Sequence, residues 1–135
     1  RSQKDQVVSE QVQGAYIVAT IMVVDDSQFM RKRISRSLAS NGFDVCEAAD
    51  GQEAVDTYRQ TKPDVTLMDI IMPNKDGLEA LAEIRQFDAQ ARVIMLTALD
   101  QQAVMVEAMR LGAKDFLTKP VAPDRLIATI QKLLG

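Results

Sequence analysis

Residues 64–77, DVTLMDIIMPNKDG, join a short run typical of a buried strand to an acidic residue. The run 65–68 favours β-structure, and Asp69 follows it directly. Moving a carboxylate out of water costs free energy unless the charge is paired or hydrogen-bonded. We therefore expect Asp69 to have charged partners, a chemical role, or both.

Strand-like and helix-like segments alternate around this stretch, from residue 20 to the end of the chain. The expected strands cover residues 20–24, 43–47, 65–68, 92–96 and a segment centred on 116–117. A helical spacing of apolar residues follows each of them, at 28–40, 54–58, 78–84, about 101–111 and 126–133. Five such units predict an α/β fold with helices on both faces of a parallel sheet. We expect a flavodoxin-like doubly wound (βα)5 arrangement with strand order 2-1-3-4-5.

Residues 1–19 fall outside this alternation, and we predict that they form an N-terminal extension or linker to a domain spanning residues 20–135. Val8, Val12 and Ala15 recur at helical spacing within this polar segment. Three alternatives stay open for it: a short helix, a linker from another domain, or a disordered arm.

Composition excludes several classes of function. The net charge of −3 gives no reason to expect direct nucleic-acid binding. No apolar run approaches the roughly 20 residues that membrane insertion requires. One cysteine and no recognisable secretory signal favour a reducing, cytoplasmic location. Because the chain has no histidine, its chemistry must come from carboxylates, hydroxyls and amines.

Polar residues mark the carboxyl ends of four expected strands: Asp25 and Asp26, then Asp69, Thr97 and Lys119. In an open parallel sheet these ends meet in one crevice. Three carboxylates that converge repel one another, so they either take up protons or hold a cation such as Mg2+. With Mg2+ and Lys119 neutralising charge, Asp69 could attack phosphorus and form an aspartyl phosphate.

Each of these residues also has an ordinary explanation when it is taken alone. Asp26 or Ser27 would be a helix N-cap, and Asp69 a loop residue bonded to backbone N–H groups. Thr97 would be structural and Lys119 a solvated surface lysine. Taken singly, those explanations do not account for the fact that these polar residues all lie at the carboxyl ends of expected strands.

Four motifs in order resemble the receiver domain of two-component response regulators: VVDD (23–26), LMDIIMPNKDG (67–77), MLTA (95–98) and DFLTKP (115–120). The resemblance covers residues 20–135 and implies the same flavodoxin-like fold. It also implies that Asp69 is the phosphoacceptor. By the same resemblance, Mg2+ is the cofactor, held by Asp25, Asp26, Asp69 and the backbone carbonyl of Ile71.

The resemblance assigns roles to residues near the acceptor as well. Thr97 matches the switch hydroxyl that moves to the phosphoryl group, and Phe116 matches the switch aromatic. Phe116 is equally well explained as a core residue of the fifth strand. Lys119 matches the lysine that pairs with the phosphoryl group, and Pro120 follows a candidate cis peptide bond.

Receivers accept phosphate from phosphohistidine, which this chain cannot supply. The expected donor is a histidine kinase or phosphotransfer protein. We expect a signalling module rather than an enzyme, one that assists its own phosphorylation and dephosphorylation. Ile71 and Leu99 occupy the two family positions that border the acyl phosphate, and their apolar side chains predict slow self-dephosphorylation.

The output is expected on the surface formed by the fourth helix, the fifth strand and the fifth helix. Along the fourth helix, Val104, Ala108 and Leu111 form a stripe that can dock on the sheet. Met105 and Met109 form a second stripe, predicted to face a partner. That partner is a downstream protein or domain, or a second copy in a phosphorylation-dependent homodimer. The alternative is that both stripes are core.

Competing functions fit the residues less well. A haloacid-dehalogenase-type phosphatase, with an Asp nucleophile and Mg2+, would have a second aspartate where this chain has Ile71. A flavodoxin-type electron carrier would have a small-residue phosphate loop in place of DDSQFMR. The segment DDSQFMRKR (25–33) is similar to single-domain chemotaxis receivers, and no effector domain is expected after the last helix. The other alternative is a receiver that belongs to a larger regulator or hybrid kinase.

Overall fold

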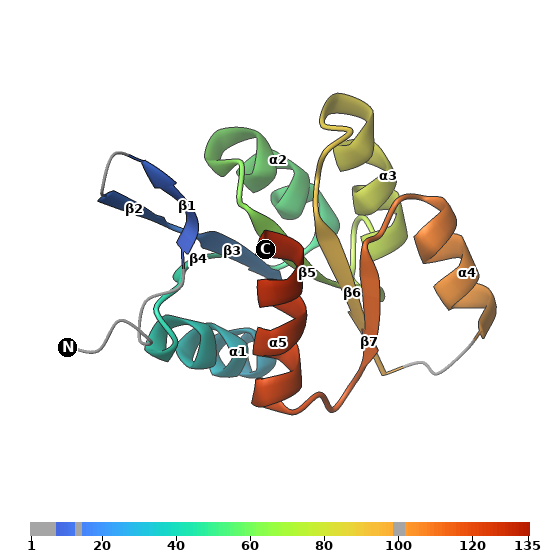
Figure 1. Ribbon diagram of the computed structural model, residues 1–135. Helices are drawn as coiled ribbons and strands as arrows, with labels where there is room; N and C mark the ends of the chain where they lie inside the picture. Colours follow the sequence, from blue (N-terminus) through green and yellow to red (C-terminus); the bar gives the residue numbers. More distant parts are fainter. Residues whose placement is uncertain (1–7, 13–14, 99–101) are drawn as a thin grey trace.

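A five-stranded parallel sheet forms the centre of the computed structural model, which describes residues 8–12, 15–98 and 102–135. The sheet order is β4-β3-β5-β6-β7 (Figure 1). Numbered within this sheet, that order is 2-1-3-4-5, so the predicted flavodoxin-like topology is confirmed. The strands are β3 (Thr20–Val24), β4 (Asp44–Ala48), β5 (Val65–Asp69), β6 (Val93–Thr97) and β7 (Asp115–Thr118).

Helices cover both faces of the sheet (Figure 1). One face packs against α1 (Gln28–Ser40) and α5 (Pro123–Leu134). The other packs against α2 (Gly51–Thr61), α3 (Gly77–Phe87) and α4 (Gln102–Arg110). Within the described part of the chain, no helix combines the length and apolar character needed to cross a bilayer.

The strands bury side chains on both faces, which explains why their sequences are nearly continuous apolar runs. On β3, Ile21 and Val23 belong to the core beneath α1 and α5, whereas Met22 and Val24 belong to the core on the opposite face. The other central strands alternate in the same way. Two apolar cores thus hold the sheet rigidly, and its carboxyl edge is left for polar residues.

Side-chain caps start three helices close to that edge. Ser27 is the N-cap of α1, and its hydroxyl accepts a hydrogen bond from the Met30 N–H at 3.2 Å. Asp50 caps α2, and Asp76 forms a reciprocal capping box with Glu79 at the start of α3. Because Ser27 is the cap of α1, the carboxylate of Asp26 is not used for that purpose.

The N-terminal segment contains an antiparallel pair of strands, β1 (Val8–Val12) and β2 (Ala15–Val18), that lies apart from the main sheet (Figure 1). The short helix that we considered for residues 1–19 is therefore wrong for the described part of this segment. The physical reason is that valine and isoleucine favour extended backbone. The antiparallel pairing of the two strands, in which Val8 lies opposite Val18, stabilises that extended backbone.

Gly77 fixes how closely α3 approaches the end of β5. Its N–H donates a hydrogen bond to the Ile70 carbonyl oxygen at 2.7 Å. A Cβ atom at this position would lie 2.1 Å from the Asp69 carbonyl oxygen and 2.9 Å from the Ile70 Cα. Both neighbours are backbone atoms, so no side-chain rotation could relieve the overlap.

We predict that Gly77→Ala lowers the free energy of unfolding by about 1–3 kcal/mol, because the strand end and the helix must separate. Urea denaturation followed by circular dichroism measures this change. Gly135→Ala is the matched control, since its added Cβ would meet only the Gln131 carbonyl oxygen at 3.3 Å. A Gly77→Ala protein as stable as the wild type would show that the contact is not restrictive.

Candidate functional site

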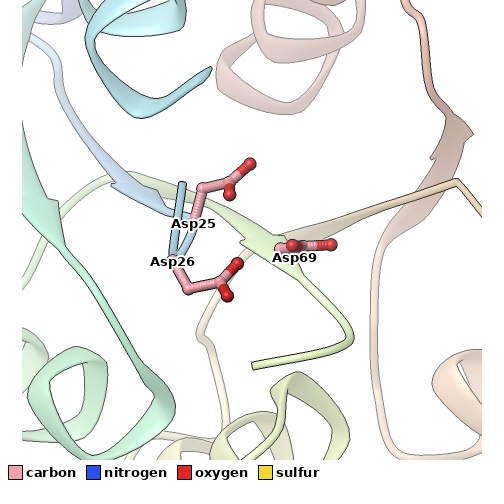
Figure 2. A group of neighbouring side chains, drawn as sticks. All are labelled: Asp25, Asp26 and Asp69. Carbon is pink, nitrogen blue, oxygen red and sulfur yellow. The ribbon is translucent and has the colours of Figure 1, made fainter. Parts of the chain in front are cut away.

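Three acidic side chains converge at the carboxyl edge of the sheet, as Figure 2 shows. Asp25 and Asp26 follow β3, and Asp69 ends the neighbouring strand β5. One carboxylate oxygen from each residue lies within 4.8 Å of the others. Asp25 is only 2% exposed, Asp69 is half-buried and Asp26 is exposed. The site therefore opens to solvent on the side of Asp26.

Lys119 supplies a positive charge to this cluster. Its ammonium nitrogen lies 2.7 Å from Asp25 Oδ2 and 3.6 Å from Asp69 Oδ2. The backbone holds the lysine in place, because the Lys119 N–H donates to the Thr97 carbonyl oxygen at 2.7 Å. The peptide bond between Lys119 and Pro120 is cis. The Lys119 amine thus forms ion pairs with two of the three carboxylates, those of Asp25 and Asp69.

Asp25 has further contacts that fix its position. Its Oδ1 accepts a hydrogen bond from the Ser27 N–H at 2.9 Å. Its carbonyl oxygen accepts one from Arg31 Nη1 at 2.7 Å, and Arg31 Nε pairs with Glu47 at 3.0 Å. Sequence reasoning missed Arg31. The available signal was a cation in the first turn or so of a helix, where the helix dipole disfavours it unless an acidic partner is near.

Burial raises the pKa of Asp69 from its ordinary value of 3.8 to about 6. Lys119 opposes this increase, and so does the Ile70 N–H, which donates to Asp69 Oδ1 at 2.9 Å. The charges of Asp25 and Asp26 add to it. The ionised form of Asp69 is therefore destabilised in the free protein, and a bound cation would relieve that destabilisation.

The ligand set matches the chemistry of a hard divalent cation. Carboxylate oxygens together with water are the preferred ligands of Mg2+. The three carboxylates are close enough to contribute to one ion. Ile71, whose carbonyl was expected to join them, lies two residues beyond Asp69, and this residue is 61% exposed.

The two expected switch residues lie on adjacent strands. Thr97 is buried at the end of β6, opposite Thr118 of β7. Phe116 is half-buried on β7 and packs against the core on the side of α2, α3 and α4. This packing agrees with the core interpretation of Phe116 and is compatible with the switch interpretation, which stays a prediction.

On α4, the docking stripe of Val104, Ala108 and Leu111 packs against the core of the sheet. Met105 is half-buried, and Met109 is 49% exposed. The side chain of Met109 is therefore available at the surface. Leu99, the second residue behind the predicted slow dephosphorylation, lies outside the described residues.

The sequence profile of the response regulator receiver domain matches residues 21–131. The chain is 49% identical to the chemotaxis protein CheY of Bacillus subtilis over 116 residues, which cover 85% of this chain and 97% of that protein. It is 40% identical to the CheY of Thermotoga maritima over 114 residues, covering 84% and 95% of the two chains.

Solved structures agree with these matches. The crystal structure of the CheX–CheY–BeF3–Mg2+ complex from Borrelia burgdorferi superposes with a TM-score of 0.83 at 34% identity, covering 87% of this chain and 90% of that chain. The chain belongs to the response regulator receiver domain family. Receiver domains are signalling modules of two-component systems, so the phosphatase and electron-carrier alternatives have no support.

We predict that Asp69→Asn raises the free energy of unfolding at pH 7 in EDTA, on the order of 1–3 kcal/mol. The pKa of Asp69 is higher in the folded protein than its ordinary value of 3.8, so ionisation of Asp69 lowers the free energy of unfolding, with the full effect reached above about pH 6. As the pH falls from 6 to below 4, the folded wild type takes up the proton preferentially and the difference between the proteins should shrink. Urea denaturation at a series of pH values measures it.

Asp44→Asn is the matched control, because Asp44 is an exposed aspartate at the amino end of β4. It should change stability little. Equal stability of Asp69→Asn and the wild type at pH 7 would contradict a destabilised acceptor carboxylate.

Proposed function

We propose that this receiver takes a phosphoryl group from a phosphohistidine onto Asp69 and thereby changes the surface formed by α4, β7 and α5. The donor is a histidine kinase or a phosphotransfer protein. One observation carries the proposal: Asp69 lies beside an acidic pair that can hold a cation with it, and the Lys119 ammonium nitrogen lies 3.6 Å from its carboxylate.

The transfer is a single displacement at phosphorus. A carboxylate oxygen of Asp69 forms the new P–O bond while the P–N bond to the donor imidazole breaks. The electron pair leaves with the imidazole nitrogen, which then takes up a proton from solvent. The product on Asp69 is an acyl phosphate. Lys119 is close enough to Asp69 to pair with an oxygen of the transferred group.

Asp25, Asp26, Asp69 and the backbone carbonyl of Ile71 would hold Mg2+. When bound, Mg2+ supplies positive charge that neutralises the phosphoryl oxygens. Asp25 is positioned for this role by the Ser27 N–H and by Lys119. The exposure of Asp26 leaves the donor protein a path to the site. The same residues would assist both phosphorylation and dephosphorylation.

The signal would leave the site through Thr97 and Phe116. Movement of the Thr97 hydroxyl toward the phosphoryl group would let Phe116 follow on the neighbouring strand and reshape the surface beside α4. The receiver of the Borrelia burgdorferi complex is bound to CheX. For this chain we propose a downstream protein or domain, or a second copy, as the partner of that surface.

We propose that these events take place in the cytoplasm. Two arrangements are compatible with the relatives. The chain spans 97% of the Bacillus subtilis CheY but only 49% of the response regulator MprA of Mycolicibacterium vanbaalenii. The two arrangements are a stand-alone module and a receiver within a larger regulator or hybrid kinase.

Incubation with acetyl phosphate and Mg2+ should add one acid-stable, base-labile phosphoryl group to the wild-type protein. Intact mass spectrometry detects it, and EDTA should prevent it. Asp69→Asn should lose the modification completely, whereas Asp44→Asn, which keeps the site intact, should be modified at the wild-type rate. Full modification of Asp69→Asn at that rate would refute the proposal.

Replacing Met105 and Met109 together with glutamate should abolish phosphorylation-dependent association while leaving phosphorylation of Asp69 unchanged. Charges on this face of α4 would oppose an apolar partner, and neither residue belongs to the buried core of the described chain. Analytical ultracentrifugation with and without acetyl phosphate measures homodimerisation. The dissociation constant for a partner protein, determined under the same two conditions, measures binding to that partner.

Phe29→Glu serves as the control for that double variant, since Phe29 is an exposed apolar residue on α1. It should associate normally. Unfolding of the double variant would place both methionines in the core, and normal association would place the output surface elsewhere.

A further inference from the structure

The loop between β5 and α3, residues 70–76, carries the backbone carbonyl that would complete the Mg2+ site. Ile71 and Asn74 of this loop are both exposed, so apolar packing of their own side chains does not hold them in place. A metal ligand on such a loop binds well only if other contacts fix the backbone beforehand.

The loop is attached at its end to two helices. At its junction with α3, the Gly77 N–H donates to the Ile70 carbonyl oxygen at 2.7 Å. The Gly51 N–H, at the start of α2, donates to the Lys75 carbonyl oxygen at 2.9 Å. The side chain of Lys75 forms an ion pair with Glu83 of α3.

Asn74 adds a side-chain contact to α2. Its Nδ2 donates to Asp50 Oδ2 at 2.9 Å, across 24 positions of sequence. Its backbone has φ +67°, in the left-handed region that asparagine adopts more easily than most residues. The conformation and the hydrogen bond together direct the side chain of Asn74 onto Asp50, the N-cap of α2.

Asp50 uses both carboxylate oxygens for structure. Oδ1 accepts the Glu53 N–H at 2.8 Å as the N-cap of α2, and Oδ2 accepts Asn74. Asp50 is not one of the three carboxylates that converge on the metal site. Its contacts therefore join the fixed end of a helix to the loop that carries Ile71.

We propose that Asn74 and Asp50 are positioning residues for Mg2+ binding: their hydrogen bond holds the 70–76 loop so that the Ile71 carbonyl faces the three carboxylates. This inference rests on the function proposed above and adds two residues that do not touch the ion. The start of α2 would thereby influence metal affinity indirectly, through the 70–76 loop.

Two substitutions remove the bond while keeping the other role of each residue. Asn74→Gly removes the donor and retains a residue that tolerates positive φ. Asp50→Ser retains a helix N-cap but is too short to reach Asn74. Asn41→Gly is the matched control, because Asn41 is an exposed asparagine at the C-cap of α1, at the opposite end of that helix from Asp25, and its side chain donates to the Ser37 carbonyl oxygen. Asp26→Asn removes a proposed metal ligand directly.

Isothermal titration calorimetry with Mg2+ alone measures the dissociation constant of each folded protein, and urea denaturation in EDTA measures its stability. Each single substitution should weaken Mg2+ binding by about 3–10-fold, the range expected for loss of one hydrogen bond. The double variant should be no weaker than the more affected single variant, because both changes remove the same interaction. Asn41→Gly should bind like the wild type.

Wild-type Mg2+ affinity in Asn74→Gly, or effects that multiply in the double variant, would overturn the inference while leaving the proposed function intact. A purely structural role would lower stability in EDTA without changing the dissociation constant of the folded protein, and that result also overturns it. No Mg2+ binding by the wild type would instead refute the proposed function, and the inference with it.

Discussion

Three carboxylates at one edge of a parallel sheet repel one another, and Lys119 only partly compensates them. The lysine lies closer to Asp25 than to Asp69, at 2.7 Å against 3.6 Å. Asp25 is therefore the better-paired acid. Burial of Asp69, with smaller contributions from the charges of Asp25 and Asp26, raises its pKa to about 6 despite the opposing charge of Lys119. The free protein holds its acceptor carboxylate in an environment that a cation or a protein partner would improve.

That arrangement depends on the rest of the fold. Two apolar cores, one on each face of the sheet, bury the strands almost completely and offset the cost of the charged edge. The parallel topology brings together residues that are 44 positions apart in sequence, at the ends of β3 and β5. Hydrogen bonds from Gly77 and Gly51 then fold the following loop back against the sheet and α2. The site is a consequence of this packing rather than of any one motif.

Much of this could be predicted from sequence, because both the fold and the acidic cluster follow from local patterns. Continuous β-branched runs separated by helical spacing specify a parallel sheet, and the carboxyl ends of such strands are adjacent. Asp25, Asp26, Asp69 and Lys119 were located in this way. The pairing of β1 with β2 was not, since valines four residues apart fit a helix as well as a strand. The contacts of Arg31 with Glu47 and of Asn74 with Asp50 were also missed, because each joins residues that only the tertiary structure brings together.

The central claim is that Asp69 is an incompletely compensated carboxylate poised for a cation, and an NMR titration of its side-chain carboxyl carbon tests it most directly. The titration would be performed in EDTA and again with saturating Mg2+. We predict a pKa near 6 in EDTA and a markedly lower one with Mg2+, because the bound cation favours the ionised form. An Asp69 that titrates near its ordinary value of 3.8 in EDTA and does not respond to Mg2+ would contradict the account.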